Sequence, residues 1–367
     1  MLMAWLRSSG RKTITALAGL CLAFTLAATP AAAGAGGYVE TDLASDIPGR
    51  APLTDSTLVN PWGLVRGPMT PWWTADNGVG LSTLLKADGT RFPAPFNPVN
   101  VPMADCSGTG TPTGIAFDGT GSFNFNDCSG VARHGRFIFA TEDGSIVAWD
   151  IPLTTAVTVV NPSSAAVYKG LAIGTNSQGT FLYAANFRAG TVDVFDTNFH
   201  HATLAGSFSD PDIKSGFAPF GIANLGGQLY VTYAKQDATL HDDVAGSSNG
   251  FVDIFDTNGN LIRRAATRGR LNSPWGVAIA PATFGRFSGD LLVGNFGDGR
   301  INVIDPVTGE FLDQLRGPDN RPLVIDGLWA IVFGSGSTNS GPTNALFFTA
   351  GLDDESHGLF GRIDPTS

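Results

Sequence analysis

Short apolar segments and segments of alternating polarity follow one another in a fixed order along this chain. The order is clearest between residues 275 and 315, where Trp275–Ile279 and Asp290–Gly294 are mostly apolar and Arg300–Asp305 alternates apolar with polar residues. Strict alternation is typical of a strand with one buried face, and the Thr308-Gly309 pair before Glu310–Leu315 is typical of a turn. The pattern predicts four short strands joined by turns, which is an antiparallel sheet.

The same unit occurs six times, each time after a short phrase that contains a glycine. These glycines are 51, 56, 51, 55 and 51 residues apart, and they are Gly63, Gly114, Gly170, Gly221, Gly276 and Gly327. A four-stranded repeat of about 50 residues predicts sheets arranged radially. We therefore expect an all-β fold, a six-bladed β-propeller of four-stranded antiparallel blades. The sixth copy ends after its third strand, so we expect the N-terminal segment Tyr38–Leu43 to supply the missing outer strand and close the ring.

The position of the glycines has a steric interpretation. Each one opens the first strand of its copy, and six first strands must crowd around a central channel, where a side chain would collide with its neighbours. Trp62, Phe220 and Trp275 directly precede three of the glycines. We expect these aromatic residues to wedge between adjacent blades as part of the core rather than to form a platform for a ligand.

The first 33 residues have the features of a secretory signal peptide. Arg7, Arg11 and Lys12 precede the apolar run Ile14–Ala28, and Ala31–Ala33 offers small residues for cleavage. The run is shorter than the ~20 residues of a membrane-spanning helix, and no later segment approaches that length. We expect removal of residues 1–33, export to the periplasm or medium, no membrane span in the mature chain, and one propeller domain over residues 34–367.

The charge balance narrows the classes of partner. The chain has 22 basic and 32 acidic residues, a formal net charge of −10, and the leader holds three of the basic residues. The mature chain thus has 19 basic against 32 acidic residues, or −13. An acidic protein repels nucleic acid and anionic membrane surfaces, so we expect neither as a partner and consider cations and neutral ligands compatible.

Two cysteines lie outside the leader, Cys106 and Cys128, and they flank the strand predicted at Gly114–Phe117. In an oxidising compartment an isolated pair more often forms a disulfide than a metal site. We expect a bridge between the two long loops on either side of that strand. No clustered histidines accompany the pair, which argues against zinc.

Four stretches of the chain resemble a known family. They are Asn60-Pro-Trp-Gly63, Leu182–Asp196, Gly289–Ile301 and Asp326-Gly-Leu-Trp329. They are similar to exported bacterial propellers of uncharacterised function, which are distantly similar to NHL-type propellers. The resemblance covers nearly the whole mature chain and implies a six-bladed fold and export. It implies no activity.

Polar residues recur where the second strand of each copy ends. In a propeller, the ends of the second strands and the starts of the first strands should lie on the same face, around the mouth of the channel. The column that the six copies form is Asp76, Glu142, Asn186, Tyr233, Asn295 and Gly351, with Asp326 and Lys169 on the same rim. Carboxylate and amide oxygens suit Ca²⁺ or Mg²⁺. By residue type alone, Asp76, Glu142, Asn186 and Asn295 resemble the metal cluster of calcium-dependent propeller lactonases, in which the metal polarises the lactone carbonyl and activates water.

Three interpretations of this column stay open. The residues can recur because hairpin turns favour Asp, Asn and Gly, as in Asp76-Asn-Gly78 and Glu142-Asp-Gly144. They can instead hold a metal, with or without Asp326, or form a polar binding ring without one. A solvated turn needs no ligand, whereas the other two interpretations require the side chains to converge.

Two turns on the same face are longer than a hairpin needs, and long loops on a rigid scaffold often carry function. The first contains Lys235, Asp237, His241, Asp242 and Asp243, and the second contains Asp353, Asp354, Glu355 and His357. They can cover the channel or hold a second cation, or they can be solvated acidic loops.

The remaining sequence motifs do not indicate a catalytic site. Gly246-Ser-Ser-Asn-Gly250 matches the G-x-S-x-G pattern, but it leads into a strand and not into the helix of a nucleophile elbow. The sequence thus favours a binding or scaffolding module for a small molecule, glycan or protein at the channel mouth. The alternative is a Ca²⁺- or Mg²⁺-dependent hydrolase of the lactonase type.

Overall fold

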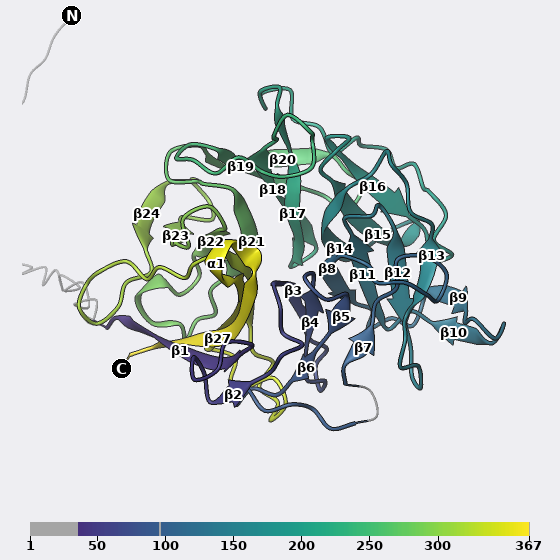
Figure 1. Cartoon of the computed structure of the whole chain (residues 1–367). Coiled ribbons are helices and arrows are strands. Elements are labelled where there is room, and N and C mark those ends of the chain that lie inside the picture. The colour runs from purple at the N-terminus through teal and green to yellow at the C-terminus, as the bar shows by residue number, and fades with distance from the viewer. Residues whose placement is uncertain (1–35, 95–96, 367) are drawn as a thin grey trace, which may run out of the picture. The chain divides into compact units, whose positions relative to one another are not determined.

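The structure, a computed structural model, describes residues 36–94 and 97–366, so the predicted signal peptide of residues 1–33 lies outside the described residues. Six antiparallel sheets form a ring with very little helix (Figure 1). The first strand of each sheet contacts the first strands of the two neighbouring sheets around the centre. This arrangement confirms the six-bladed β-propeller. Within the described part of the chain, no helix is long and apolar enough to cross a membrane.

The first three blades follow one another along the chain. Blade one contains β3 (Pro61–Val65), β4 (Trp72–Asp76), β5 (Leu81–Ser82), β6 (Leu84–Leu85) and β7 (Val99–Asn100). Blade two contains β8 (Pro112–Phe117), β11 (Phe137–Thr141), β12 (Ile146–Trp149) and β13 (Val157–Val160), with a hairpin of β9 (Asn124–Asn126) and β10 (Ala132–His134) inserted after β8. Blade three contains β14 (Tyr168–Asn176), β15 (Gly179–Asn186) and β16 (Thr191–Phe195). Its outer edge is reduced to a bridge between Phe195 and His201.

The last three blades repeat the plan. Blade four contains β17 (Phe217–Leu225), β18 (Gln228–Lys235), β19 (Gly250–Phe255) and β20 (Leu261–Thr267). Blade five contains β21 (Pro274–Ile279), β22 (Leu291–Asn295), β23 (Ile301–Ile304) and β24 (Phe311–Gln314), with the 3-10 turn η1 (Gly285–Phe287) between β21 and β22. Blade six contains β25 (Leu328–Phe333), β26 (Leu346–Gly351) and β27 (His357–Pro365), with the single turn α1 (Leu352–Glu355) between β26 and β27.

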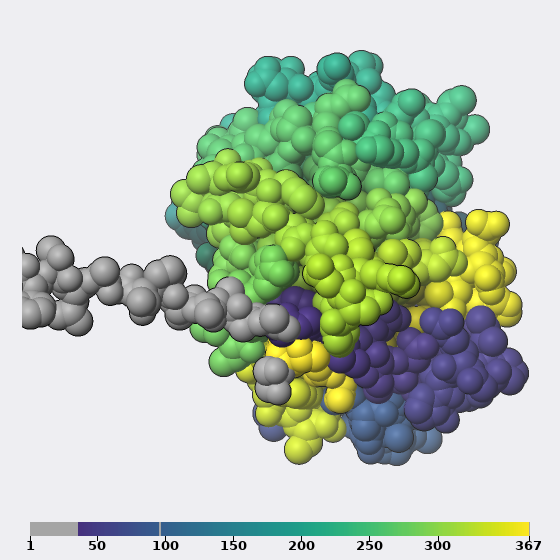
Figure 2. All heavy atoms as spheres, turned by 90° about the vertical axis from the view of Figure 1, so that its left-hand side faces the viewer, coloured from purple at the N-terminus to yellow at the C-terminus, as the bar shows by residue number. Residues whose placement is uncertain are grey.

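The N-terminal strand closes the ring, as predicted from the missing strand of the sixth copy. Strand β1 (Tyr38–Ser45) pairs antiparallel with β27, and β2 (Leu53–Thr54) extends the same sheet. Tyr38 also donates hydrogen bonds toward blade five, from its backbone N–H to the carbonyl of Arg316 and from its hydroxyl to the carbonyl of Phe284. Figure 2 shows the purple N-terminal residues between the green and yellow residues of the last blades. The two ends of the described chain thus complete one blade.

Close approach of the neighbouring blade's first strand explains five of the six repeated glycines. A Cβ added to Gly114 would lie 2.5 Å from the backbone nitrogen of Leu171, and one added to Gly170 would lie 2.6 Å from that of Ile222. The side chain is therefore excluded because the next first strand lies against the glycine. Blade six differs: strand pairing places Ala330 at this position, and Gly327 lies three residues earlier with a φ of +60°. The prediction that Gly327 takes the same place in its blade as the other five repeated glycines was therefore wrong.

Large apolar side chains fill the spaces between neighbouring blades. Trp73 of blade one stacks on Phe137 of blade two with ring centroids 3.9 Å apart. Phe284 and Phe333 make an edge contact between blades five and six at 4.9 Å. Such aromatic pairs contribute about 0.5–1.5 kcal/mol each beyond the burial of their area. The core is thus a set of inter-blade seams, which hold the rim of the channel in a fixed position.

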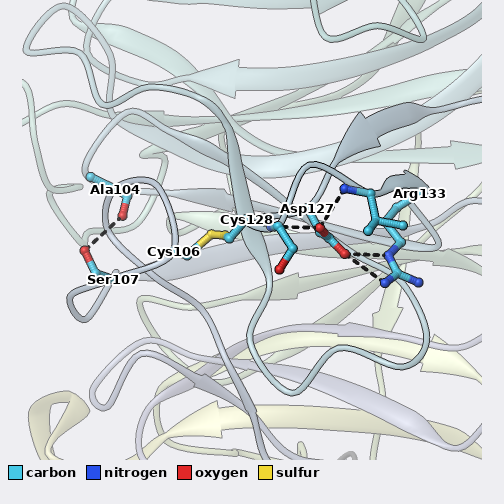
Figure 3. The surroundings of a disulfide bond; sticks show 8 residues. Ala104, Cys106, Ser107, Asp127, Cys128 and Arg133 are labelled. Carbon is cyan, nitrogen blue, oxygen red and sulfur yellow. Dashed lines mark hydrogen bonds and ion pairs between the residues drawn. A yellow bond between two sulfur atoms is a disulfide. The ribbon is translucent and has the colours of Figure 1, made fainter.

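The predicted disulfide between Cys106 and Cys128 is present. It joins the loop after blade one to the turn of the β9–β10 hairpin, on the two sides of β8 (Figure 3). Beside it, Asp127 accepts hydrogen bonds from the backbone N–H of Val131 and from Arg133 Nε. The bridge and this ion pair therefore fix an insertion that has few strand contacts of its own.

Candidate functional site at the channel mouth

Aromatic rings close the channel near the points where the first strands begin. We call this group the aromatic plug, and it consists of Trp62, Phe187, Phe220, Trp275, Phe296 and Trp329. Trp329 stacks on Trp62 and on Phe296 with centroid distances of 3.7 and 3.9 Å, and Phe220 lies 6.0 Å from it. Trp62 and Phe220 belong to opposite blades, so these residues are core, as expected, but they meet at the axis instead of wedging between adjacent blades.

A buried lysine lies on the plug. Lys169, in β14, is 1% exposed, and its Nζ lies 4.7 Å from the ring centre of Trp62. The same Nζ lies 2.5 Å from Oε1 of Glu142, whose other oxygen accepts a hydrogen bond of 2.9 Å from Asn77. Burial of an ammonium group is costly unless it is paired. Glu142 supplies that pairing, so blades one, two and three are tied together at the mouth.

The long loop of blade four brings more charge to Lys169. Asp237 begins a turn in which its carboxylate accepts hydrogen bonds from the Thr239 hydroxyl and from the backbone N–H groups of His241 and Thr239, and these bonds lower the pKa of Asp237 to about 2. The turn places Asp242 Oδ1 3.5 Å from Lys169 Nζ and 2.8 Å from His241 Nδ1. Asp237 therefore has a structural role, and Asp242 and His241 face the cluster.

The loop of blade six supplies a further carboxylate through a strained turn. Asp353, Asp354 and Glu355 are consecutive residues with φ values of 52°, 52° and 65°. A left-handed conformation costs roughly 1–2 kcal/mol for each residue with a side chain. The turn directs Glu355 to Asn60, whose Nδ2 donates to Glu355 Oε2 at 2.7 Å. Strain of this kind persists where the surrounding structure holds it and is concentrated at functional sites.

The charges at the mouth do not balance. We call Glu142, Lys169, His241, Asp242, Asp243 and Glu355 the channel-mouth cluster. With all four carboxylates ionised and His241 neutral, the cluster has a formal charge of −3. Burial raises the pKa of Glu355, and nearby Glu142 and Asp243 raise it further. Burial also raises the pKa of Asp243.

Two indole N–H groups beside the cluster have no hydrogen-bond partner in the part of the chain that the structure describes, Trp62 Nε1 and Trp275 Nε1. Both rings are buried, with 3% and 8% of their surface exposed. The Asp243 carboxylate and the Ser273 hydroxyl, by contrast, interact with each other. A buried donor or acceptor without a partner costs about 1–3 kcal/mol, so the two indole N–H groups indicate a place for a bound molecule or ion.

One group of atoms in the cluster has the spacing of metal ligands. An oxygen of Glu142, a ring nitrogen of His241 and an oxygen of Asp242 all lie within 4.8 Å of one another. Two carboxylates and an imidazole can hold a divalent cation, and the nitrogen ligand favours transition metals over Ca²⁺. A cation bound there would compete with the Lys169 ammonium for Glu142 and Asp242.

The structure places the other residues of the predicted column in their own blades. Asp76 is fully buried, accepts a 2.6 Å hydrogen bond from the Thr83 hydroxyl, and has its pKa raised to about 7 by burial. Asn186 binds the backbone N–H of Val167 and the carboxylate of Asp193. Asn295 likewise binds the backbone of the segment before β21 and the Asp298 carboxylate. The side-chain amides of Asn186 and Asn295 therefore stabilise turns in their own blades.

Strand register explains why the column separates. Asp76, Asn186 and Asn295 pair with the residue two positions before the repeated glycine. In blade two this position belongs to Thr141, and Glu142 lies one residue further on. A shift of one residue turns a side chain to the other face. No hydrogen bond joins any two of Asp76, Glu142, Asn186 and Asn295, all of which the structure describes, and their shared metal stays a prediction.

The remaining predicted residues lie near the cluster or support it. Asp326 is exposed and accepts the backbone N–H of Asp353. His357 pairs with Asp46 at 2.7 Å, which raises the pKa of its imidazole. Tyr233 is buried in the seam beside blade three, and burial raises the pKa of its phenol. Lys235 is exposed and closes its loop by accepting the Val244 N–H at its carbonyl.

Sequence reasoning missed four residues of the mouth, namely Asn60, Asn77, Ser273 and Trp329. Asn60, Ser273 and Trp329 all lie in or beside the repeated phrases, directly before or within the start of a first strand. Asn77 follows Asp76 in a sequence typical of a turn. Their position in the repeat was therefore a usable signal, whereas the contacts of Asn77 with Glu142 and of Asn60 with Glu355 depend on the closed ring.

Comparison with known proteins identifies viral relatives. No protein-family model matches the chain. An uncharacterised protein of Acanthamoeba polyphaga mimivirus is 31% identical over 332 residues, which cover 88% of this chain and 78% of that protein. A second uncharacterised protein of the same virus is 31% identical over 322 residues, covering 84% of this chain and 81% of that protein. The bacterial origin that the resemblance implied therefore gains no support.

Solved structures match over most of the chain at low identity. A Bacteroides thetaiotaomicron protein of unknown function has a TM-score of 0.51 at 10% identity and covers 90% of this chain and 76% of its own. A glucose dehydrogenase has a TM-score of 0.51 at 12% identity and covers 88% of this chain and 99% of its own. At these identities the likeness shows the fold alone.

Proposed function

This chain belongs to the family of the two uncharacterised mimivirus proteins, and we propose that it is a binding module whose channel-mouth face holds a divalent cation. The observation that carries this proposal is the excess of carboxylates in the channel-mouth cluster, four around one buried lysine, which give a formal charge of −3 when all are ionised. A divalent cation would offset most of that charge. It would also find three ligand atoms within 4.8 Å of one another on Glu142, His241 and Asp242.

The pKa shifts in the cluster support the same ligand. Burial raises the pKa of Glu355 and of Asp243, and mutual repulsion among the carboxylates adds to both shifts. A cation favours the ionised form of nearby carboxylates and lowers their pKa. Binding should therefore release protons and should strengthen as the pH rises, since protonation of the carboxylates competes with the cation.

Calorimetric titration tests the proposal directly. After dialysis against EDTA and then metal-free buffer, Mn²⁺, Mg²⁺ and Ca²⁺ are titrated into the wild-type protein and into Asp242→Asn. Asp212→Asn is the matched control, because Asp212 is an exposed aspartate in the segment between blades three and four. We expect one site per chain, with affinity reduced roughly ten-fold or more in Asp242→Asn and unchanged in Asp212→Asn. Equal affinities in all three proteins, or no binding of any ion, would overturn the proposal.

We also infer that the protein acts outside the cytoplasm. The inference rests on the leader-like sequence of residues 1–33 and on the Cys106–Cys128 disulfide, since structural disulfides form and persist mainly in oxidising compartments. Expression with the native leader should yield an exported protein that begins at Gly34. Intact-protein mass spectrometry of the exported fraction measures this, and a full-length cytoplasmic product with three free thiols would contradict it.

A further inference from the structure

The channel contains a cavity on the far side of the aromatic plug from the channel-mouth cluster. Its volume is about 410 Å³, and all six first strands line it. The residues that follow the repeated glycine position in each blade are all aliphatic, and they are Leu64, Ile115, Leu171, Ile222, Val277 and Ile331. The cavity has the size of a small-molecule site, which is about 300–1,000 Å³.

The far end of the cavity is also mostly apolar. Phe117, Ile173, Ile279 and Phe333 line it where the first strands end, and Asn224 is the uncharged polar side chain among the lining residues. The plug closes the other end, because Trp275 lines the cavity and Trp329 fills the axis behind it. A ligand must therefore enter from the face where the first strands end, and a long polymer cannot pass through.

Arg66 is the charged residue among those that line this cavity. Its Nε donates to the Phe333 carbonyl at 2.9 Å and its Nη2 donates to the Gly334 carbonyl at 3.1 Å. Across residues 36–94 and 97–366, no carboxylate forms an ion pair with Arg66, and its Nη1 has no hydrogen-bond partner. Burial lowers the pKa of Arg66, and no acidic group offsets this effect. The guanidinium is held in place by two backbone carbonyls, and its Cζ also lies 5.9 Å from the centre of the Trp72 ring. Among the described residues no carboxylate neutralises its charge.

We propose that this cavity binds an aliphatic carboxylate, with the alkyl chain among the six aliphatic side chains and the carboxylate on Arg66. The apolar wall recognises the chain through the hydrophobic effect, and the unpaired guanidinium recognises the anion through a charge-assisted hydrogen bond. An acidic protein with a net charge of −10 repels anions in general, so a single unpaired cation at an apolar cavity is specific for an anion that carries an apolar tail. This site does not depend on the channel-mouth cluster.

The wild-type protein tests the proposal with simple probes. Octanoate, octanol and acetate are titrated calorimetrically at pH 8, where both carboxylic acids are ionised. We expect octanoate to bind about ten-fold or more tightly than octanol, because octanol lacks the charge. Acetate should bind far more weakly still, since each methylene contributes about three- to four-fold in affinity. Equal binding of octanoate and octanol would refute the role of Arg66. If neither octanoate nor octanol binds, the proposed site is refuted.

Variants assign the effect to Arg66. Arg66→Gln should lose the preference for octanoate over octanol, and Arg66→Lys should recover part of it because the positive charge is restored. Arg321→Gln is the matched control, since Arg321 is 85% exposed and does not line the cavity. Melting of each variant shows whether it is folded. An unchanged preference in a folded Arg66→Gln protein would overturn the assignment.

Discussion

Replacement of Lys169 by methionine tests how the channel mouth is held together. Methionine keeps an unbranched chain of similar length and removes the charge. Lys169 is 1% exposed, and its Nζ lies 2.5 Å from Glu142 and 3.5 Å from Asp242. Removal of one partner from a buried ion pair costs about 3–5 kcal/mol, because the remaining charge is left without compensation. Here the repulsion among the remaining carboxylates adds to that cost.

The expected loss can be converted into a melting temperature. With an unfolding entropy of about 2.1 cal/mol/K per residue, a domain of about 330 residues has roughly 0.7 kcal/mol/K at its midpoint. A loss of about 3–5 kcal/mol then lowers Tm by about 4–7 °C. The loss should be smaller at pH 5 than at pH 8, because Glu355 and Asp243 have raised pKa values and take up protons in the folded state as the pH falls.

Differential scanning calorimetry of the wild-type protein and four variants, Lys169→Met, Glu142→Gln, Lys169→Met/Glu142→Gln and Lys214→Met, measures this effect. Lys214→Met is the control, because Lys214 is exposed and forms no ion pair with any residue that the structure describes. In the double variant Lys169→Met/Glu142→Gln the uncompensated carboxylate is removed, so we expect a smaller loss than in Lys169→Met alone. If Lys169→Met melts within 1 °C of Lys214→Met, or if the two substitutions at the mouth simply add, the account of a buried, coupled pair is wrong.

Three further predictions concern other parts of the molecule. Burial raises the pKa of Asp76 from 3.8 to about 7, so the free energy of unfolding should fall as the pH rises between these values. Asp76→Asn should remove up to about 4 kcal/mol of this fall. If the free energy from urea unfolding changes between pH 4 and pH 8 as much in Asp76→Asn as in the wild type, the prediction is contradicted. Asp354→Gly should raise the free energy of unfolding by about 1 kcal/mol because glycine tolerates a φ of 52°, and a lower value in urea unfolding would refute the strain. Cys106→Ser with Cys128→Ser should lose about 3 kcal/mol by loop-closure entropy over a separation of 22 residues, and unchanged stability would exclude a structural role for the bridge.

The fold could be predicted in detail because its information is periodic. Each blade repeats the order of apolar strand, alternating strand and glycine turn, so six weak local signals support one another. Closure by β1 could be predicted because strands could be counted, and the sixth copy lacked one. The exception is Gly327, which lies in a turn against the backbone of Gly351, while Ala330 takes the position beside the neighbouring first strand. One glycine phrase resembled the others in sequence but not in register.

For the site, the sequence predicted which face of the molecule carries it but not which residues lie together there. Glu142, His241, Asp242 and Glu355 were placed on the channel mouth, but their mutual distances depend on how two long loops fold over the ring. The grouping of Glu142 with Asp76 depended on an alignment that was one residue out of register, which no local pattern in blade two reveals. The aromatic plug was likewise invisible, because its members are far apart in sequence and meet only after the ring closes.

Thermal melting of the EDTA-treated protein with added Mn²⁺, Mg²⁺ or Ca²⁺ tests most directly whether the channel mouth binds a cation. A bound ion stabilises the folded state by mass action, by about 2.7 kcal/mol at one hundred times Kd. We predict that one of the ions raises the wild-type Tm at pH 8, raises it less at pH 5, and has little effect on Asp242→Asn. No shift with millimolar concentrations of all three ions, or an equal shift in Asp242→Asn, would contradict the account.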